Sequence, residues 1–219
     1  MGYEAVVFDN DGVLLSLTSM AVHRAGARAA FESVGVAQPA AEDVEAMSIG
    51  VRVPRLEAVC DRYGVDPAAF WRARDREVSA AQRAQMRAGA KRPYSDVGSL
   101  TAFDCPLGVV SSNQQATVEF AFDHFELTEH FATVQARPPT VESLRRKKPE
   151  PYYIERALAR LNTDEALYVG DRESDVVAAH RAGVDAAFLR RPHTETTALS
   201  ERPEYDLPGL DAVVDVTEK

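Results

Sequence analysis

A short apolar run near the N-terminus constrains this chain more than any other stretch. Residues 5–8 are all apolar and rich in β-branched side chains, which is typical of a strand buried inside a parallel sheet. The run ends at Asp9, Asn10, Asp11 and Gly12. Open α/β sheets bind ligands beyond the carboxyl ends of their strands, so the two carboxylates are predicted to lie at such an edge. Taken alone, two solvated aspartates at a strand exit explain the pattern equally well.

Three later segments carry polar residues where a strand or loop is expected to end. Residues 107–113 read LGVVSSN, an apolar run that ends in hydroxyl and amide side chains. Lys148 closes a basic run and immediately precedes Pro149. Residues 167–175 read LYVGDRESD, an apolar run that leads to Asp171 and Asp175. Each segment is a weak signal alone, but the four occur in order along the chain.

Together these four segments resemble the ordered motifs of the haloacid dehalogenase-like hydrolases, and the resemblance covers essentially the whole chain. It implies an α/β fold: a Rossmann-like three-layer α/β/α core with a mostly parallel sheet and an inserted all-helical cap. The nearest resemblance is to phosphoglycolate phosphatase-like and β-phosphoglucomutase-like members. Asn10 stands where the family more often has an apolar or aromatic residue, and we interpret this departure as tolerated.

The resemblance also implies a catalytic role for the first and last motifs. Asp9 is the expected nucleophile that forms an aspartyl-phosphate, and Asp11 is the expected general acid and then general base. Asp9, Asp11 through its backbone carbonyl, and Asp171 are expected to hold Mg²⁺, which suits carboxylate oxygen ligands. Asp175 is expected to orient Lys148 or a metal-bound water. The four aspartates are expected to converge with only Lys148 as a nearby positive charge.

The two middle motifs are expected to bind the phosphoryl group. The resemblance implies that Ser111 and Lys148 act in catalysis, and that Ser111, Ser112, Asn113 and Lys148 contact the phosphoryl oxygens. Ser111 alone is explained better as a helix N-cap, a role that Ser112 or Asn113 could also fill. Lys148 alone could be a solvated lysine of the basic run 145–148, although its position before Pro149 favours it over Lys147.

The region between the first two motifs shows no strand-like alternation, and we expect it to be an all-helical insert. Residues 16–91 are therefore predicted to form the cap, and residues 1–15 with 92–219 the catalytic core. The predicted cap helices cover residues 18–34, 40–47, 56–63 and 66–87, the last with one interruption. In the core, the predicted strands cover 106–110, 131–135, 166–169 and 186–189. Helices are expected near 96–103, 114–125, 149–161 and up to residue 182, and a final strand or helix within 205–216.

A break in the cap pattern suggests where substrates are discriminated. Residues 48–55 contain a glycine, a proline and two arginines, Arg52 and Arg55. The stretch resembles the substrate-specificity loop of related capped enzymes, and an arginine there could clamp a carboxylate or a second phosphate. The sequence does not show which of Arg52 and Arg55 would bind this group. The alternative, that both are ordinary surface arginines, explains the sequence equally well.

Composition limits the setting in which the protein works. The chain has 219 residues and a net charge of −9, which disfavours nucleic acid as a partner. It contains no apolar run of membrane-spanning length and no apparent signal peptide, so we expect no membrane association. Cys60 and Cys105 form no metal spacing, as expected of a reducing cytoplasm. A monomer or a homodimer is expected.

The sequence therefore predicts a Mg²⁺-dependent phosphatase of small phosphorylated metabolites, either phosphoglycolate-like compounds or sugar phosphates. A β-phosphoglucomutase-like phosphomutase is the first alternative, because it would use the same motifs and cap. A true dehalogenase is disfavoured by Asp11, since dehalogenases of this superfamily lack the second aspartate. A non-catalytic scaffold is the last alternative, and the presence of all four motifs argues against it.

Overall fold

A parallel sheet organises the fold of this chain. The structure is a computed structural model and describes residues 2–217. Within these residues the sheet has six strands in the order β3-β2-β1-β4-β5-β6, and each neighbouring pair is parallel. The strands are β1 (Ala5–Phe8), β2 (Leu107–Gln114), β3 (Thr133–Arg137), β4 (Ala166–Gly170), β5 (Asp185–Leu189) and β6 (Tyr205–Leu207). This order places β1 between β2 and β4, so residues that follow these three strands meet at one edge.

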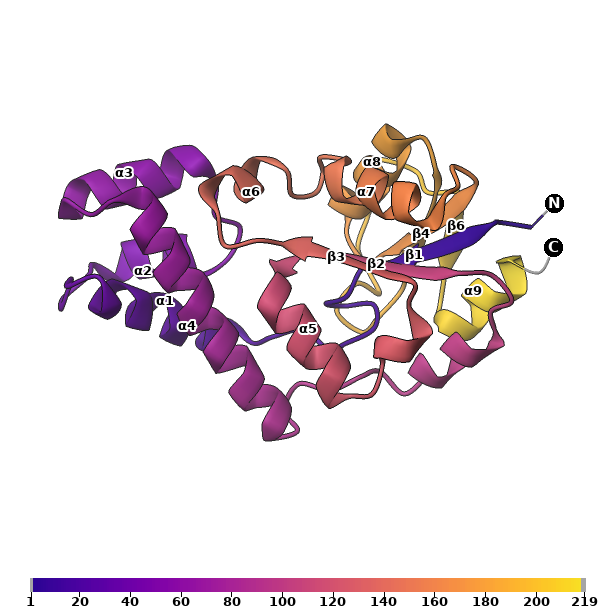
Figure 1. Cartoon of the computed structure of the whole chain (residues 1–219), viewed down its shortest axis with the longest axis horizontal. Helices are drawn as coiled ribbons and strands as arrows, with labels where there is room; N and C mark the ends of the chain where they lie inside the picture. Colours follow the sequence, from indigo (N-terminus) through magenta and orange to yellow (C-terminus); the bar gives the residue numbers. More distant parts are fainter. Residues whose placement is uncertain (1, 218–219) are drawn as a thin grey trace.

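Helices cover both faces of the sheet, which gives three layers (Figure 1). Because side chains alternate along a strand, Val6 and Phe8 of β1 pack on one face, while Ala5 and Val7 pack on the other. The first face is covered by α5 (Gln115–His124), α9 (Leu210–Thr217) and the 3₁₀ helix η1 (Val97–Ala102). The second face is covered by α7 (Tyr152–Leu161) and α8 (Glu173–Ala182). Burial on both faces explains why β1 is apolar at every position.

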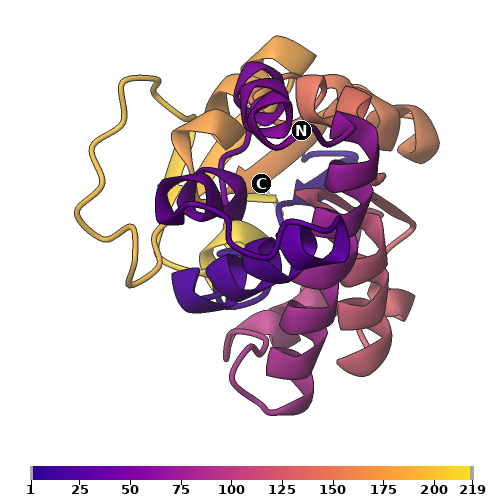
Figure 2. The same ribbon diagram turned by 90° about the vertical axis from the view of Figure 1, so that its left-hand side faces the viewer.

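Four helices between β1 and β2 form a separate cluster beyond one end of the sheet (Figures 1 and 2). We call them the helical insert: α1 (Met20–Ser33), α2 (Ala41–Ser48), α3 (Val53–Tyr63) and α4 (Pro67–Arg87). They share an apolar cluster, in which Phe31, Phe70 and Trp71 are almost fully buried and to which Leu144 of the core also belongs. Local signals set the junction of α3 and α4, since Asp66 caps the N-terminus of α4 through a 2.7 Å hydrogen bond from the Ala69 N–H.

The α/β fold class, the parallel sheet and the inserted helices agree with the prediction from sequence. Several local expectations were wrong. Helix α4 runs from Pro67 to Arg87 without the expected interruption. The short helix expected after Asp96 is present, as a 3₁₀ helix. Residues 205–216 contain both β6 and most of α9 rather than one element. Two short helices, α6 (Val141–Arg145) and η2 (Thr128–His130), were not predicted at all. No helix within residues 2–217 combines the length and the apolar character needed to cross a membrane.

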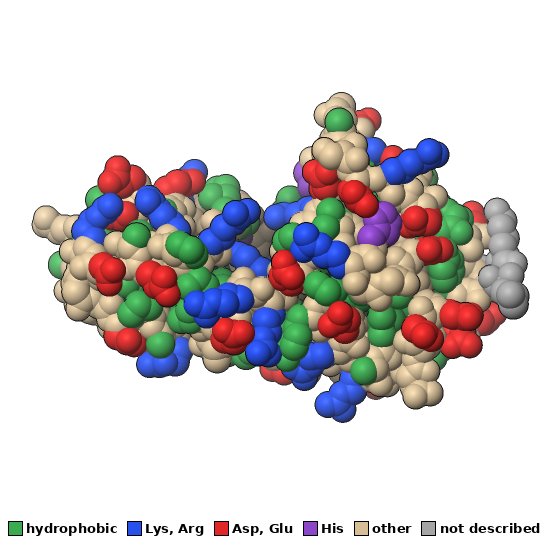
Figure 3. Space-filling view, turned by 90° about the horizontal axis from the view of Figure 1, so that it is seen from above, with side chains coloured by type: hydrophobic (Ala, Val, Ile, Leu, Met, Phe, Trp, Pro, Cys, Tyr) green, Lys and Arg blue, Asp and Glu red, His purple; other side chains and the backbone are tan. Residues whose placement is uncertain are grey.

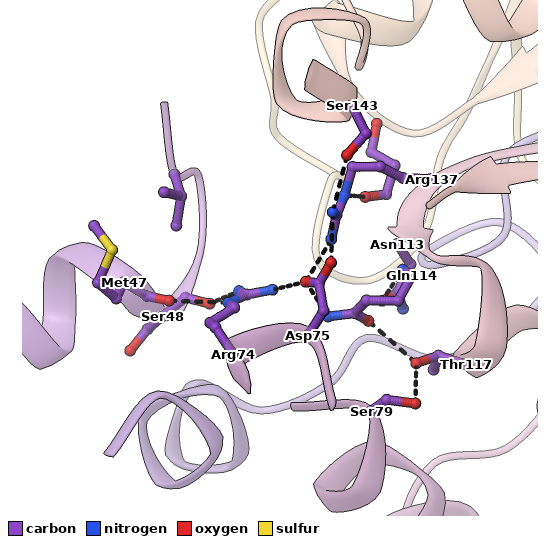
Figure 4. A network of polar contacts seen from close by, with 12 residues as sticks. Met47, Ser48, Arg74, Asp75, Ser79, Asn113, Gln114, Thr117, Arg137 and Ser143 are labelled. Atoms are coloured by element: carbon purple, nitrogen blue, oxygen red, sulfur yellow. Dashed lines mark hydrogen bonds and ion pairs between the residues drawn. The ribbon is translucent and has the colours of Figure 1, made fainter. Parts of the chain in front are cut away.

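A buried polar network joins the insert to the sheet (Figure 4). Both terminal nitrogens of Arg137, at the end of β3, donate to the Asp75 carboxylate of α4 at 2.7 Å. The Arg74 guanidinium lies 3.3 Å from the same carboxylate, and the Gln114 amide donates to it at 3.3 Å. All four side chains are buried. Asp75 thus compensates two buried guanidinium groups at the boundary between the insert and the core.

Replacing Asp75 with asparagine is expected to lower the free energy of unfolding by about 3–5 kcal/mol, because Arg74 and Arg137 would be left buried without a counter-charge. Denaturant titration measures this change. Glu45→Gln is the matched control, since it breaks an ion pair with Arg24 whose two side chains are each 51% exposed. That pair is expected to contribute less than about 1 kcal/mol. Similar small losses for both variants would contradict a structural role for the network.

Candidate active site

The predicted site residues meet at the carboxyl ends of three adjacent strands. Asp9 directly follows β1, residues 111–113 lie in the last part of β2, and Asp171 directly follows β4. Asp175 lies in the first turn of α8, which begins two residues after Asp171. The sheet order therefore brings together motifs that are more than 150 residues apart in the chain. This is the edge at which open α/β sheets bind ligands.

Lys148 connects two of the aspartates. Its Nζ lies 2.8 Å from Asp9 Oδ1 and 2.6 Å from Asp175 Oδ1. It also donates to the Tyr168 hydroxyl at 2.9 Å. Burial alone would lower the pKa of the Lys148 ammonium, but Asp175 and Asp9 outweigh it, and the pKa lies well above its ordinary value. Lys148 is therefore charged, and it fixes the position of the Asp9 carboxylate. The contact with Tyr168 was not predicted.

Three buried carboxylates crowd together beside Lys148. Oxygen atoms of Asp9, Asp171 and Asp175 lie within 4.8 Å of one another. Burial, as the largest cause, raises the pKa of both the Asp9 and the Asp171 carboxyls to about 7. Neighbouring carboxylates raise both pKa values further, and Lys148 opposes them. One ammonium is too little positive charge for this cluster, so the donor set suits a further cation.

The contacts of each carboxylate separate candidate metal ligands from supporting residues. Asp171 Oδ1 is buried and has no hydrogen-bond partner within residues 2–217. By contrast, Asp175 Oδ1 pairs with Lys148, and its Oδ2 accepts the backbone N–H of Asp171 at 3.2 Å and of Arg172 at 2.9 Å. Asp175 Oδ1 also lacks a hydrogen bond within these residues but forms the ion pair with Lys148, and Asp175 Oδ2 is occupied by two backbone N–H groups. The residues fit a Mg²⁺ site in which Asp9 and Asp171 supply the free carboxylate oxygens.

Gly12 makes room for Asp171. Its φ angle is +97°, and a Cβ at this position would lie 2.1 Å from Asp171 Oδ2. The backbone conformation and the close approach both require glycine. Gly170 has a similar role beside Asp175, since a Cβ at position 170 would lie 2.2 Å from the Asp175 Cβ. The two glycines allow the acidic side chains to pack against the chain at the strand ends.

Asp11 is not part of this carboxylate cluster, and it pairs with a second buried lysine. Lys91 lies just after the insert, its side chain is 1% exposed, and it contacts both Asp11 Oδ1 and the Ser16 carbonyl. Burial would raise the pKa of the Asp11 carboxyl, but Lys91 and a 2.8 Å hydrogen bond from Asn113 Nδ2 lower it below its ordinary value. The expectation that Lys148 is the only nearby cation was therefore wrong. No local motif around Lys91 indicated this contact.

His193 is a further contact that the sequence did not indicate. Its Nε2 lies 2.7 Å from Asp171 Oδ2. Burial, followed by repulsion from Arg172 and Arg191, lowers the pKa of the imidazole, so the ring is neutral near pH 7. A neutral ring shares one hydrogen bond with Asp171, which orients that carboxyl group. The scattered histidines had offered no recognisable pattern.

The end of β2 connects the phosphate-binding candidates with the insert. Ser111 is buried, and its Oγ accepts the Asn113 N–H at 3.1 Å. The N-cap of α5 is Gln114, so none of the three predicted residues caps that helix. The Asn113 amide donates to Asp11 and also to Gln82 of α4, at 3.0 Å. A side chain of the insert therefore reaches Asp11 through a single intermediate residue.

A cavity of about 790 Å³ lies between the insert and the strand ends. Asp9, Ser111 and Lys148 line it from the core, and Arg52 and Gln82 line it from the insert. Arg55 does not line this cavity; its guanidinium lies 4.0 Å from Asp43 within the insert. The structure thus separates the two arginines that the sequence could not distinguish.

Comparison with known proteins agrees with this geometry. A model of the haloacid dehalogenase-like hydrolase family matches residues 6–189, and the chain belongs to this family, as its motifs predicted. It is 26% identical to a phosphoglycolate phosphatase of Neisseria meningitidis, over 96% of this chain and 92% of that protein. It is 28% identical to the pyrophosphatase PpaX of Bacillus velezensis over 57% of each chain. With PpaX, and with a phosphoglycolate phosphatase of Rhodobacter capsulatus, the match spans only about half of the relative.

Solved structures share the fold. A predicted phosphoglycolate phosphatase from Haemophilus somnus superposes with a TM-score of 0.66, at 18% identity and 98% coverage of both chains. CbbY from Rhodobacter sphaeroides, solved in complex with phosphate, superposes with a TM-score of 0.67 at 20% identity, over 94% of this chain and 92% of that one. At these identities the structural likeness concerns the fold alone.

Mg²⁺ is expected to raise the melting temperature more at pH 8 than at about pH 5.5. The folded-state pKa of Asp9 and Asp171 is about 7, above the ordinary 3.8, so both carboxyls hold protons at the lower pH and Mg²⁺ must displace them. As the pH rises through 7 these protons leave, which destabilises the metal-free folded state and favours metal binding. The measurement is the melting temperature with Mg²⁺ minus that with a chelator.

Comparing the melting temperatures with Mg²⁺ and with chelator at the same pH cancels the contributions of titratable groups that Mg²⁺ does not affect. Asp171→Asn should reduce the gain from Mg²⁺ at pH 8. Equal melting temperatures with Mg²⁺ and with chelator at both pH values, or a larger gain at the lower pH, would contradict a metal site at these carboxylates.

Proposed function

We propose that this protein is a Mg²⁺-dependent phosphatase that hydrolyses a small phosphorylated metabolite through an aspartyl-phosphate on Asp9. The observation that carries the proposal is the contact of Asp9 with Lys148 at the floor of a large cavity. This ion pair holds one carboxylate in place at a site that also offers a cation to an anionic substrate. The relatives named as phosphatases support the same reaction class.

Asp9 and Lys148 perform the first step in this proposal. One Asp9 oxygen attacks the phosphorus atom, and the bond from phosphorus to the ester oxygen breaks. The Lys148 ammonium orients the carboxylate and attracts the phosphoryl oxygens, while Asp175 holds the lysine. Ser111, Ser112 and Asn113 at the end of β2 are proposed to bind the remaining phosphoryl oxygens.

Asp11 is proposed to move the protons. It would donate a proton to the leaving oxygen and later accept one from the water that hydrolyses the aspartyl-phosphate. The Lys91 contact favours the ionised form, which is the form that accepts the proton from water. Acting as the acid requires a protonated Asp11, so the contact with Lys91 must loosen when the ester binds.

Asp9, Asp171 and the backbone carbonyl of Asp11 are proposed to hold Mg²⁺. When bound, the ion would neutralise charge between the Asp9 carboxylate and the anionic phosphoryl group. The contact with His193 orients Asp171. Residues 16–91 are proposed to act as a cap on a core of residues 1–15 and 92–219, because helices of the insert and the strand ends line one cavity.

Phosphoglycolate-like compounds and sugar phosphates are the proposed substrates. A phosphomutase that interconverts sugar phosphates is the alternative, because the basic residues at the insert end of the cavity could hold the second phosphate of a bisphosphate. Product analysis separates the two: free phosphate for the phosphatase, an isomerised sugar phosphate for the mutase. The free cysteines Cys60 and Cys105 are consistent with the proposed cytoplasmic setting.

Asp9→Asn is expected to reduce phosphate release from a panel of small phosphoesters to below about one-tenth of the wild-type rate, because the amide is a poor nucleophile. Asp104→Asn is the matched control, since that aspartate is exposed and lies outside the cavity. Melting temperatures establish that both variants fold. An Asp9→Asn variant that keeps more than about one-tenth of the activity would overturn the assignment.

Asp11→Asn is expected to lower turnover by roughly 10²–10⁴-fold for alkyl phosphates, the usual contribution of general acid–base catalysis. With an aryl phosphate, whose leaving group needs no proton, the rate of aspartyl-phosphate formation should fall less. Rapid-quench measurement of phenol release and phosphate release separates the two steps. Equal losses for both leaving groups in the first step would argue against Asp11 as the general acid.

A further inference from the structure

A second cavity, of about 530 Å³, lies between the insert and the core, apart from the proposed reaction site. Its walls include one face of α4 and the first turn of α5, which pack against each other (Figure 1). Four arginines of α4 line it: Arg72, Arg76, Arg83 and Arg87. None of these four lines the cavity at Asp9, whereas Gln114 lines both cavities. The proposed phosphatase reaction therefore leaves this arginine cluster without a role.

The spacing of the four arginines places them on one face of α4. They follow one another at intervals of four, seven and four residues, and residues at these separations lie on the same side of an α-helix. Between the two pairs, Ser79 and Ala80 line the cavity with short side chains. In Figure 3, Lys and Arg side chains gather along the junction of the insert and the core. The helix thus surrounds a space, left by small residues, with long cationic side chains.

The positive charge around the second cavity exceeds the negative charge that residues 2–217 supply. The Asp75 carboxylate also lines the cavity, but Arg74 and Arg137 already bind it (Figure 4). Arg76 donates to one carboxylate oxygen of Glu77 at 2.8 and 3.0 Å. The other three arginines of the cluster form no ion pair with a described residue, and the first turn of α5 carries no acidic residue. Most of the guanidinium charge is therefore available to an anion.

Two of the arginines are held in place by contacts with α5. Arg83 donates from Nη2 to the Ala116 carbonyl at 2.7 Å. The guanidinium groups of Arg83 and Arg87 lie over the Phe120 ring, 5.2 and 4.8 Å from its centroid. Arg83 Nε is buried and has no hydrogen-bond partner within residues 2–217. Because these groups are already positioned and keep unused N–H donors, they lose less side-chain entropy when they bind an anion.

We propose that the second cavity binds an anion made of two or more linked phosphate groups, either an inorganic diphosphate or triphosphate or the phosphate chain of a nucleotide. Guanidinium groups bind phosphate oxygens in a bidentate manner. Arg76 and Arg83 are seven residues apart, or about 10 Å along the helix axis, so a phosphate chain matches their spacing better than a single phosphate ion. The volume of about 530 Å³ suits a small molecule. Such an anion contacts both α4 and α5 and so joins the insert to the core.

The test measures the binding of phosphate, diphosphate, triphosphate and ATP to the full chain by isothermal titration calorimetry. A chelator keeps Mg²⁺ from the anions and from the acidic cluster at Asp9. Triphosphate is expected to bind with a Kd at least tenfold below that of phosphate and to raise the melting temperature, because it binds the folded state. Tighter binding of ATP than of triphosphate identifies a nucleotide as the ligand, and equal or weaker binding identifies the phosphate chain alone.

Variants assign the binding to the arginine cluster. Arg76→Met and Arg83→Met, one from each pair, are each expected to raise the Kd of triphosphate by about tenfold. Because Arg83 also donates to the Ala116 carbonyl, Arg87→Met is a further variant of the same pair that leaves this hydrogen bond in place, and it should weaken binding in the same direction. Melting temperatures without ligand establish that each variant folds.

Two control variants remove positive charge elsewhere. Arg160→Met is the matched control, because it removes an exposed charge on α7 that lines neither cavity. Lys147→Met removes a charge from the cavity at Asp9. Both are expected to change the Kd of triphosphate by less than about twofold.

Three outcomes would overturn the inference. The first is equal affinity for phosphate and triphosphate, or an affinity for triphosphate that the arginine variants leave unchanged. The second is a loss in Lys147→Met as large as that in Arg76→Met, which would place the anion in the cavity at Asp9. The third is tighter binding of hexaglutamate or of a short oligonucleotide than of triphosphate, which would make an acidic macromolecule the partner. None of these measurements depends on phosphate release, so each outcome leaves the proposed phosphatase activity untouched.

Discussion

The interaction on which the rest of the site depends is the buried Lys148 ammonium shared between Asp9 and Asp175. Buried charges are tolerated only when they are paired, and here one cation serves two carboxylates while Asp171 adds a third. The arrangement is stable enough to hold Asp9 in place but leaves negative charge uncompensated. That imbalance gives the strand ends an affinity for another cation, and the same lysine gives the cavity an affinity for an anionic ester.

The insert is tied to this site by polar contacts rather than by apolar packing alone. Helix α4 supplies Asp75, which binds Arg137 at the end of β3, and Gln82, which contacts Asn113 and through it Asp11. Lys91, just after the insert, holds Asp11 directly. Any movement of the insert relative to the sheet would therefore alter the surroundings of the proposed acid and base.

Much of the core was predictable because its signals are local. Apolar runs that lead to Asp9, Ser111 and Asp171 mark three strands, although β2 continues past the expected end at residue 110 to Gln114. The parallel order of the sheet brings these residues together. Lys91, His193 and Arg137 were not predictable, since each meets its carboxylate through contacts between distant segments with no shared motif. The continuity of α4 was missed because its buried face includes the polar residues Arg74 and Asp75, which interrupt the apolar pattern in the sequence.

The most direct test of this account asks which carboxylate becomes phosphorylated. In Asp11→Asn, an aryl phosphate should still phosphorylate the protein, because its leaving group needs no proton, while hydrolysis of the aspartyl-phosphate stalls without a base. Acid quenching followed by borohydride reduction converts a phosphorylated aspartate to homoserine, which peptide mass spectrometry locates. The account predicts homoserine at position 9 and unmodified aspartates at positions 171 and 175. Homoserine at either of those positions, or none at position 9 despite a burst of phenol release, would contradict it.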